Sequence, residues 1–186
     1  MTIPAGLPRD RDQAGRPRNA RPRDALGRPL DHGAAGEQTL PDTVTLAPTA
    51  ALALAQRLLD DGRPFQAHEV LEAAWRTAPP GERELWRGLA QIAVGLTHAQ
   101  RGNSRGAVAL LRRGSQAACG FTGSPRHGID PAAIGRSAAD LASSIERAGL
   151  ATITPADLRL RLQGPAQSQR PVETEEVAPA PKLASE

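Results

Sequence analysis

The sequence predicts an all-α protein, a compact bundle of about five helices with irregular tails. Between residues 48 and 149, apolar residues recur every three or four positions, which is the period of helices buried along one side. The 186 residues include only two tryptophans, two phenylalanines and no tyrosine, so alanine and leucine must build the core. A sheet would favour β-branched and aromatic residues instead.

Glycine and proline divide the first part of the predicted bundle into two helices. A helix over 48–61 opens with Pro48, has apolar residues at helical spacing and stops at Gly62. Pro64 suits the first turn of the second helix, because an amide hydrogen is not needed there. The second helix fades into the proline-rich turn at 78–81.

The third predicted helix, over 82–101, is the least amphipathic of the set and therefore the most buried. Its Gly88 and Gly95 leave a flat strip, although glycine inside a helix costs about 0.5 to 1 kcal/mol relative to alanine. Close approach of another backbone would explain that cost. Asn103 or Ser104 then caps a fourth helix. The inner face of this helix carries Ala107, Leu110, Leu111, Gly114 and Ala118.

A fifth helix begins at Asp130 and Pro131 and ends at Gly149. The first four helices form two hairpins that share a pattern of glycine, alanine and leucine at an offset of 40 residues. A repeat array needs about three units or more, so two hairpins favour a bundle. We therefore predict two helical hairpins followed by a C-terminal helix.

The chain divides into three predicted parts. Residues 1–44 are rich in arginine and proline and are expected to form a disordered arm, because their apolar surface is too small to offset the entropy of ordering. Residues 45–150 form the helical bundle, and residues 151–186 form a short element followed by a disordered tail. The short element stays open between a turn and a strand, since 154–157 would cap a turn and the leucines after it alternate.

The composition disfavours several classes of partner. Net charge is only +3 and the pI is about 10.3, because Lys182 is the single lysine among many arginines. Aspartates interrupt the arginines of the arm and no aromatic residue accompanies them, so nucleic acid is disfavoured. The lone Cys119 excludes an intrachain disulfide and a cysteine zinc site. Without a membrane span or a signal segment, we expect a cytoplasmic protein.

The second helix contains the most informative motif of the chain, the run FQAHEVLEAAWR over 65–76. At about 100° per residue, an arc of roughly 120° holds Phe65, His68, Leu71, Glu72 and Trp75. We expect the helix to pack by this stripe, with Gln66, Val70, Ala73 and Ala74 on the opposite side. A buried carboxylate requires a partner. Either His68 donates to Glu72 one turn away, or a first-row metal ion or a substrate sits between them.

The motif F-x-x-H-E-x-x-E-x-x-W-R, with the later run 88–98 and the triplet Arg-Gly-Asn at 101–103, resembles a bacterial family catalogued as domain of unknown function 309. The resemblance covers about residues 50–116. It implies a small all-helical domain, and such proteins are sometimes labelled predicted metal-dependent hydrolases without an established substrate. The family's polar motif positions correspond here to His68, Glu69, Glu72, Gln91 and His98.

Two functional hypotheses follow. The first is a metal-dependent hydrolase, in which His68, Glu72 and His98 hold a divalent metal ion and Glu69 or Glu72 is the general base. Gln91 and Trp75 would then contact the substrate. HEVLE differs from the zincin motif H-E-x-x-H, because glutamate replaces its second histidine. The alternative is a non-enzymatic interaction module with a structural His/Glu cluster, which binds a small molecule, a peptide or a second copy of the chain.

Overall fold

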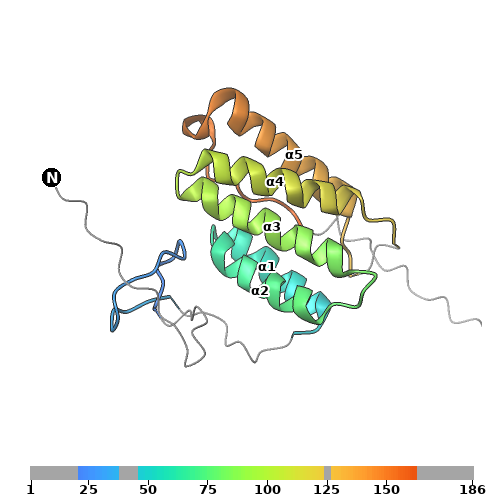
Figure 1. Ribbon diagram of the computed structural model, residues 1–186, viewed down its shortest axis with the longest axis horizontal. Helices are drawn as coiled ribbons and strands as arrows, with labels where there is room; N and C mark the ends of the chain where they lie inside the picture. Colours follow the sequence, from blue (N-terminus) through green and yellow to red (C-terminus); the bar gives the residue numbers. More distant parts are fainter. Residues whose placement is uncertain (1–20, 38–45, 124–126, 163–186) are drawn as a thin grey trace, which may run out of the picture.

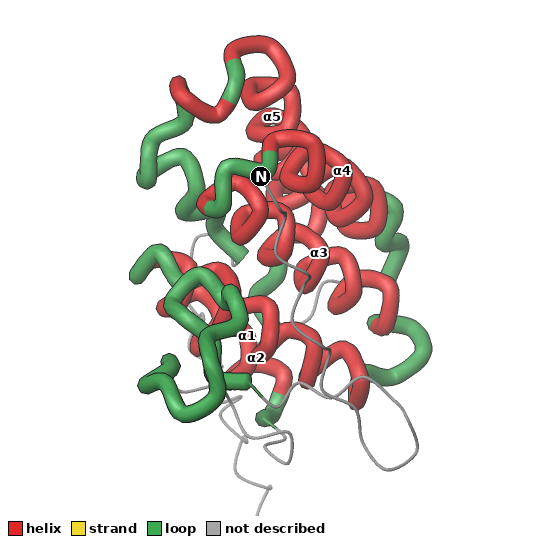
Figure 2. Tube along the Cα trace, turned by 60° about the vertical axis from the view of Figure 1, so that its left-hand side comes forward, coloured by secondary structure: helices red, strands yellow, loops and turns green. Residues whose placement is uncertain are grey.

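The computed structural model describes residues 21–37, 46–123 and 127–162, and the fold is given for these. Their regular structure is helical, and Figure 2 shows helices and loops without strands in the described part of the chain. This confirms the predicted all-α class. The helices are α1 (Pro48–Asp60), α2 (Pro64–Thr77), α3 (Arg83–Gln100), α4 (Ser104–Cys119) and α5 (Pro131–Ala148), followed by the 3₁₀ turn η1 (Leu150–Thr152).

Each helix packs against the next helix along the chain. Contacts join α1 to α2, α2 to α3, α3 to α4 and α4 to α5. Figure 1 shows the resulting stack, in which α1 and α2 lie at one end, α3 and α4 in the middle and α5 at the other end. The predicted order of two hairpins and a C-terminal helix is the order of this stack.

Local capping chemistry sets the helix ends. The Asn103 side chain accepts a hydrogen bond from the Gly106 amide at 2.9 Å, and the Asp130 side chain accepts one from Ala133 at 2.9 Å. Gly149 ends α5 with φ +78°, a conformation that a Cβ atom disfavours. Each helix boundary therefore lies within one or two residues of its predicted position.

The two central helices, α3 and α4, approach through glycine, as the sequence predicts. A Cβ atom on Gly88 would lie 2.8 Å from the Ala117 Cβ and 3.1 Å from the Gly114 carbonyl oxygen. A Cβ atom on Gly114 would lie only 2.6 Å from the Gly88 oxygen and 2.5 Å from Ile92. Backbone therefore contacts backbone here, and no side chain larger than hydrogen fits at either glycine.

The prediction for the buried face of α2 was largely wrong. Phe65, His68, Glu72 and Trp75 are only half-buried, although Leu71 points inward as expected. The opposite face of α2, which has mostly small side chains, packs against the neighbouring helices instead. Small side chains let α2 approach these helices closely. The buried residues of α2 are Pro64, Gln66, Ala67, Val70, Leu71 and Ala74.

Segment 21–37 covers the aromatic residue that α2 leaves outside. The Phe65 ring has the guanidinium carbons of Arg23 and Arg101 at 5.5 and 5.9 Å, which is cation–π distance. Arg101 also donates from Nε to the Leu26 carbonyl at 2.8 Å. Part of the arm predicted to be disordered thus has defined contacts with α2 and α3. The rest of the predicted arm and the predicted tail lie outside the described residues.

After η1 the chain returns to α1 without forming a strand. Gln56 on α1 donates to the Leu160 carbonyl at 3.3 Å and accepts from the Leu162 amide at 2.7 Å. The Leu162 side chain is fully buried, while Leu158 and Leu160 are half-buried. The sequence left this segment open between a turn and a strand. In the structure it is a loop, and Gln56 forms hydrogen bonds to its backbone.

Replacing Gly114 by alanine tests the close contact between α3 and α4. Alanine normally stabilises an exposed helical position, but here the new methyl group meets the Gly88 carbonyl. We expect the free energy of unfolding to fall by about 1 to 3 kcal/mol, as measured by urea denaturation. Gly81→Ala is the control, since its added Cβ meets nothing within 4 Å. Equal effects of the two substitutions would contradict this packing.

Leu162→Ala tests whether the returning segment belongs to the core. Loss of a fully buried leucine should lower the free energy of unfolding by about 2 to 4 kcal/mol in urea denaturation. Leu160→Ala, at a half-buried position whose backbone carbonyl accepts a hydrogen bond from Gln56, should cost clearly less. A Leu162→Ala variant as stable as the wild type would show that this segment detaches without cost.

Candidate functional site

A row of three polar side chains runs along α2. His68 Nε2 lies 3.3 Å from one carboxylate oxygen of Glu72, and Arg76 donates to the other oxygen at 2.8 Å. The side chains of His68 and Glu72 are 24% and 31% exposed, so the row lies at the edge of the bundle and not in its core. Both carboxylate oxygens of Glu72 therefore have a partner from the same helix.

Burial favours the neutral form of the His68 imidazole. Burial lowers its pKa below the ordinary value of 6.5, and the Arg76 and Arg23 charges lower it further against the opposing effect of Glu72. A neutral imidazole can donate to Glu72 only if Nε2 carries the proton. This nitrogen is then unavailable to a metal ion unless the pair with Glu72 is broken.

His98 belongs to a different part of the fold, the junction of α3 and α4. The Asn103 amide nitrogen lies 2.8 Å from His98 Nδ1, while the Asn103 amide oxygen caps α4 through Gly106. Because an amide nitrogen only donates, Nδ1 is the acceptor and the imidazole is neutral. Burial and the nearby Arg101 lower the His98 pKa, in agreement with this arrangement. His98 therefore orients a helix cap.

The structure brings together only part of the predicted metal and substrate set. No hydrogen bond or ion pair of the described chain connects His98, or the half-buried Gln91, to His68 or Glu72. Within the described ranges, no three His, Cys, Asp or Glu side chains cluster closely enough to hold a metal ion. Trp75 packs partly buried against the core. Of the predicted ligands, only His68 and Glu72 are neighbours.

A cavity of about 420 Å³ lies between α1, α2 and the end of segment 21–37. Gln66 lines this cavity and is 5% exposed, yet neither its amide oxygen nor its amide nitrogen has a hydrogen-bond partner. An unpaired buried polar group costs about 1 to 3 kcal/mol. The lining comprises Gly36, Glu37, Leu54, Leu58, Arg63, Gln66 and Glu69.

Gln66 was not predicted as a site residue. Its position in the helical pattern indicated the outer side of α2, because the opposite side has the larger apolar residues. The small residues beside it, Ala67, Val70 and Ala74, were the available signal for a closely packed face. Glu69, predicted as a general base, lines the same cavity as Gln66.

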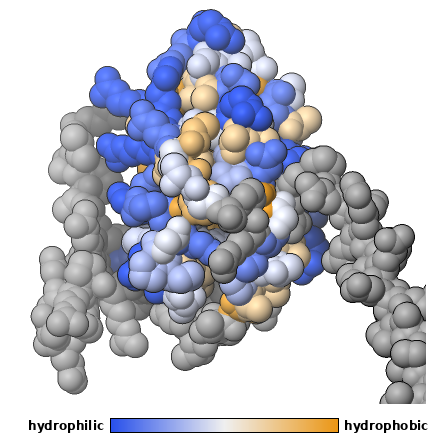
Figure 3. Space-filling view, turned by 90° about the vertical axis from the view of Figure 1, so that its right-hand side faces the viewer, coloured by the Kyte–Doolittle hydropathy of each residue, from blue (hydrophilic) through white to orange (hydrophobic). Residues whose placement is uncertain are grey.

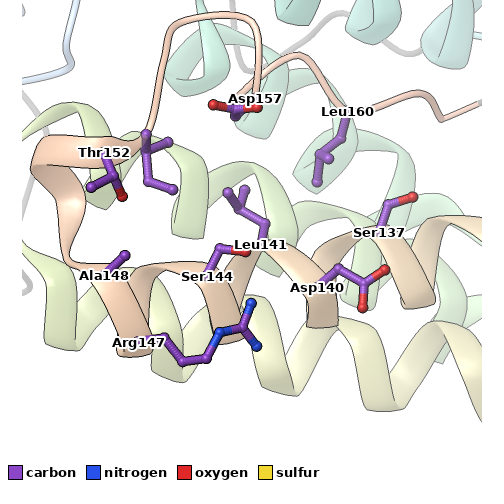
Figure 4. A pocket seen from close by; sticks show the side chains of 10 residues that line it. Ser137, Asp140, Leu141, Ser144, Arg147, Ala148, Thr152, Asp157 and Leu160 are labelled. Atoms are coloured by element: carbon purple, nitrogen blue, oxygen red, sulfur yellow. The ribbon is translucent and has the colours of Figure 1, made fainter.

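A second cavity, of about 560 Å³, lies between α5 and the segment that follows it (Figure 4). Leu141 and Leu160 supply apolar surface, while the charged side chains of Asp140 and Arg147 are exposed. Asp157 accepts hydrogen bonds from the Thr154 amide and hydroxyl, which lower its pKa. The charged groups that line this second cavity are thus exposed to solvent or paired with a nearby residue.

His127, which had no patterned context in the sequence, lies near the start of α3. Its Nε2 is 3.5 Å from a Glu82 carboxylate oxygen, and the same oxygen accepts from the Trp86 indole at 3.2 Å. Thr49 Oγ1 lies 3.5 Å from His127 Nδ1. Both histidine distances exceed the 2.6 to 3.2 Å range for proton transfer. We interpret this group as a link between the loop before α5 and the helices beside it.

Figure 3 shows one face on which hydrophobic and hydrophilic residues are interspersed around the grey segments. Among the helices that the structure describes, none combines the length and apolar character needed to cross a bilayer.

The fold and the α2 motif define a small all-helical domain whose polar motif residues lie on α2 and α3. Residues 52–110, from α1 into α4, match the model of a family described as domain of unknown function (DUF309). This match confirms the resemblance seen in the sequence.

The chain is also similar to a bacterial protein, the uncharacterized protein YpuF of Bacillus subtilis (strain 168). The two are 44% identical over 48 residues, which is 25% of this chain and 28% of that protein. The chain thus spans less than a third of the length of this relative. No solved structure matches the chain.

Acidification should destabilise the domain through His68. Its folded pKa lies below 6.5, so the unfolded chain takes up a proton first as the pH falls. The contribution of neutral His68 to the free energy of unfolding should therefore be fully present above about pH 6.5. The free energy of unfolding should decrease as the pH falls below this value. Urea denaturation at about pH 7.5 and 5.5 measures this change, which His68→Gln should reduce. An unchanged pH dependence in the variant would contradict the buried, neutral imidazole.

Proposed function

We propose that the helical domain of this chain is a non-enzymatic binding module in which His68 and Glu72 are structural. The observation that carries this proposal is the state of the Glu72 carboxylate. Its two oxygens are paired with His68 and Arg76, and these partners would compete with a metal ion or a water molecule for the carboxylate. A carboxylate that acts as general base must have an oxygen within hydrogen-bond distance of the proton that it removes.

The two cavities support a binding role. They measure about 420 and 560 Å³, within the size range of small-molecule sites. Both combine leucine side chains with a few polar groups, the usual composition of such sites. A small molecule or a peptide side chain is therefore the partner that this module would take.

A metal-dependent hydrolase is the second candidate. The specific observation in its favour is a neutral imidazole beside a carboxylate, since this is the form in which histidine binds divalent metal ions. Such a site would need His68 to turn its Nε2 away from Glu72 and would need a further ligand. His98 would have to leave Asn103 to provide it.

Metal analysis of protein purified without an affinity tag separates the two candidates. For the binding module we expect far less than one divalent ion per chain, in the wild type and in Glu72→Ala alike. Glu72→Ala should lower the free energy of unfolding by only about 1 kcal/mol, because the ion pairs that it removes are partly exposed. Mass spectrometry of metal content and urea denaturation provide both measurements.

The hydrolase alternative predicts the opposite pattern. One metal ion per chain, lost in Glu72→Ala and His68→Ala proteins that keep their helical circular dichroism, would overturn the structural role of the pair. The exposed pair Arg87 and Glu84 on α3 offers the matched control, since Glu84→Ala removes an ion pair of similar spacing elsewhere. Metal loss in Glu84→Ala as well would indicate adventitious binding.

A further inference from the structure

We propose that the cavity between α1 and α2 binds a small ligand through the side-chain amide of Gln66. The ligand has an adjacent hydrogen-bond donor and acceptor, as in a primary carboxamide or a lactam-type heterocycle. This inference rests on the proposed function, because it names the site and the ligand class of the binding module.

Gln66 is the observation that points to a ligand. Its side chain lines the cavity, although the residue is only 5% exposed. Neither the amide oxygen nor the amide nitrogen has a hydrogen-bond partner. Gln56, another buried glutamine, uses its oxygen for Leu162 and its nitrogen for Leu160 and Asp60. The fold thus pairs the one amide fully and leaves the other unpaired beside a cavity.

The shape of the amide group selects the ligand. Its oxygen and one of its N–H bonds lie on the same edge, so they can form two parallel hydrogen bonds with a group that carries both functions on one edge. Primary carboxamides and lactam rings have such an edge, and glutamine recognises adenine in this bidentate way. A trans peptide unit has its donor and acceptor on opposite sides and makes only one of the two bonds.

The remaining lining residues agree with a neutral ligand that has an apolar part. Leu54 and Leu58 lie one turn apart on α1 and offer apolar surface. Glu37 and Glu69 carry negative charge, and the positive charge of Arg63 is paired with Glu37. A carboxylate or phosphate ligand would therefore be repelled by the net negative charge of the lining. Such a ligand could accept a hydrogen bond from the Gln66 amide nitrogen but could not donate one to the amide oxygen.

The contact between Arg63 and Glu37 also fixes one wall of the cavity. It joins the start of α2 to segment 21–37, which is held in turn by a hydrogen bond of 2.8 Å from the Glu37 amide to the Arg23 carbonyl. Arg23 lies over Phe65 on α2. The wall that contains residues 36 and 37 is therefore tied to the helices at two places.

The test uses the full chain and follows the Gln66 side-chain NH₂ signals in ¹H–¹⁵N spectra, assigned by their loss in Gln66→Met. Nicotinamide and uracil are the probes, because they carry the required edge. Nicotinate has the shape of nicotinamide without the amide hydrogens, and N-acetylalanine methylamide represents a peptide unit. Binding should shift the Gln66 signals with both probes, about tenfold or more tightly for nicotinamide than for nicotinate.

Two variants make the test specific. Gln66→Met keeps the length of the side chain and breaks no hydrogen bond, so the protein should remain folded while nicotinamide binding falls by about tenfold or more. Gln116→Met makes the same exchange at an exposed position of α4 and should bind like the wild type. Gln66→Glu, which replaces the donor by a second acceptor, should also lose binding.

Four results would overturn the inference. Three are unshifted Gln66 signals with both probes, equal binding of nicotinamide and nicotinate, and wild-type binding by Gln66→Met. The fourth is a preference for N-acetylalanine methylamide, which would assign the cavity to a peptide. The metal analysis of His68 and Glu72 is independent of these spectra, so failure of this ligand class and failure of the binding module are separately visible.

Discussion

The close approach of α3 and α4 across Gly88 and Gly114 is the constraint on which the bundle depends. Aromatic side chains are scarce in this chain, so the core gains many of its contacts from leucines, small side chains and backbones at short distance. The same solution recurs on α2, where alanine and valine face inward. The short distance between the helices, and with it the position of each polar residue, follows from this scarcity of aromatic side chains.

The packing of α2 decides what its motif residues can do. With Ala67, Val70 and Ala74 turned inward, the bulky Phe65 is left for the segment before α1 to cover, and His68 and Glu72 lie at the rim. The partly exposed Glu72 carboxylate is then contacted by His68 and Arg76, each one turn away on the same helix. Gln66, in contrast, goes inward with the alanines and carries its amide beside a cavity.

The sequence was informative where structure is local. Proline, asparagine, aspartate and glycine placed the helix ends, and the glycines of α3 predicted a close backbone contact. The inward face of α2 was misjudged, because ranking by side-chain size ignores the benefit of close packing. The contacts of segment 21–37 with the helices could not be predicted, because no pattern of the sequence indicates them. Residues 36 and 37 reach the cavity beside Gln66 only through the folded path of the chain.

The double hydrogen bond of Gln56 to residues 160 and 162 has a topological consequence. The helices otherwise contact their neighbours along the chain, and a stack of that kind can open stepwise from either end. Gln56 connects the first helix to residues more than a hundred positions later. The stack becomes a closed loop of contacts, which favours cooperative opening over stepwise fraying from the ends.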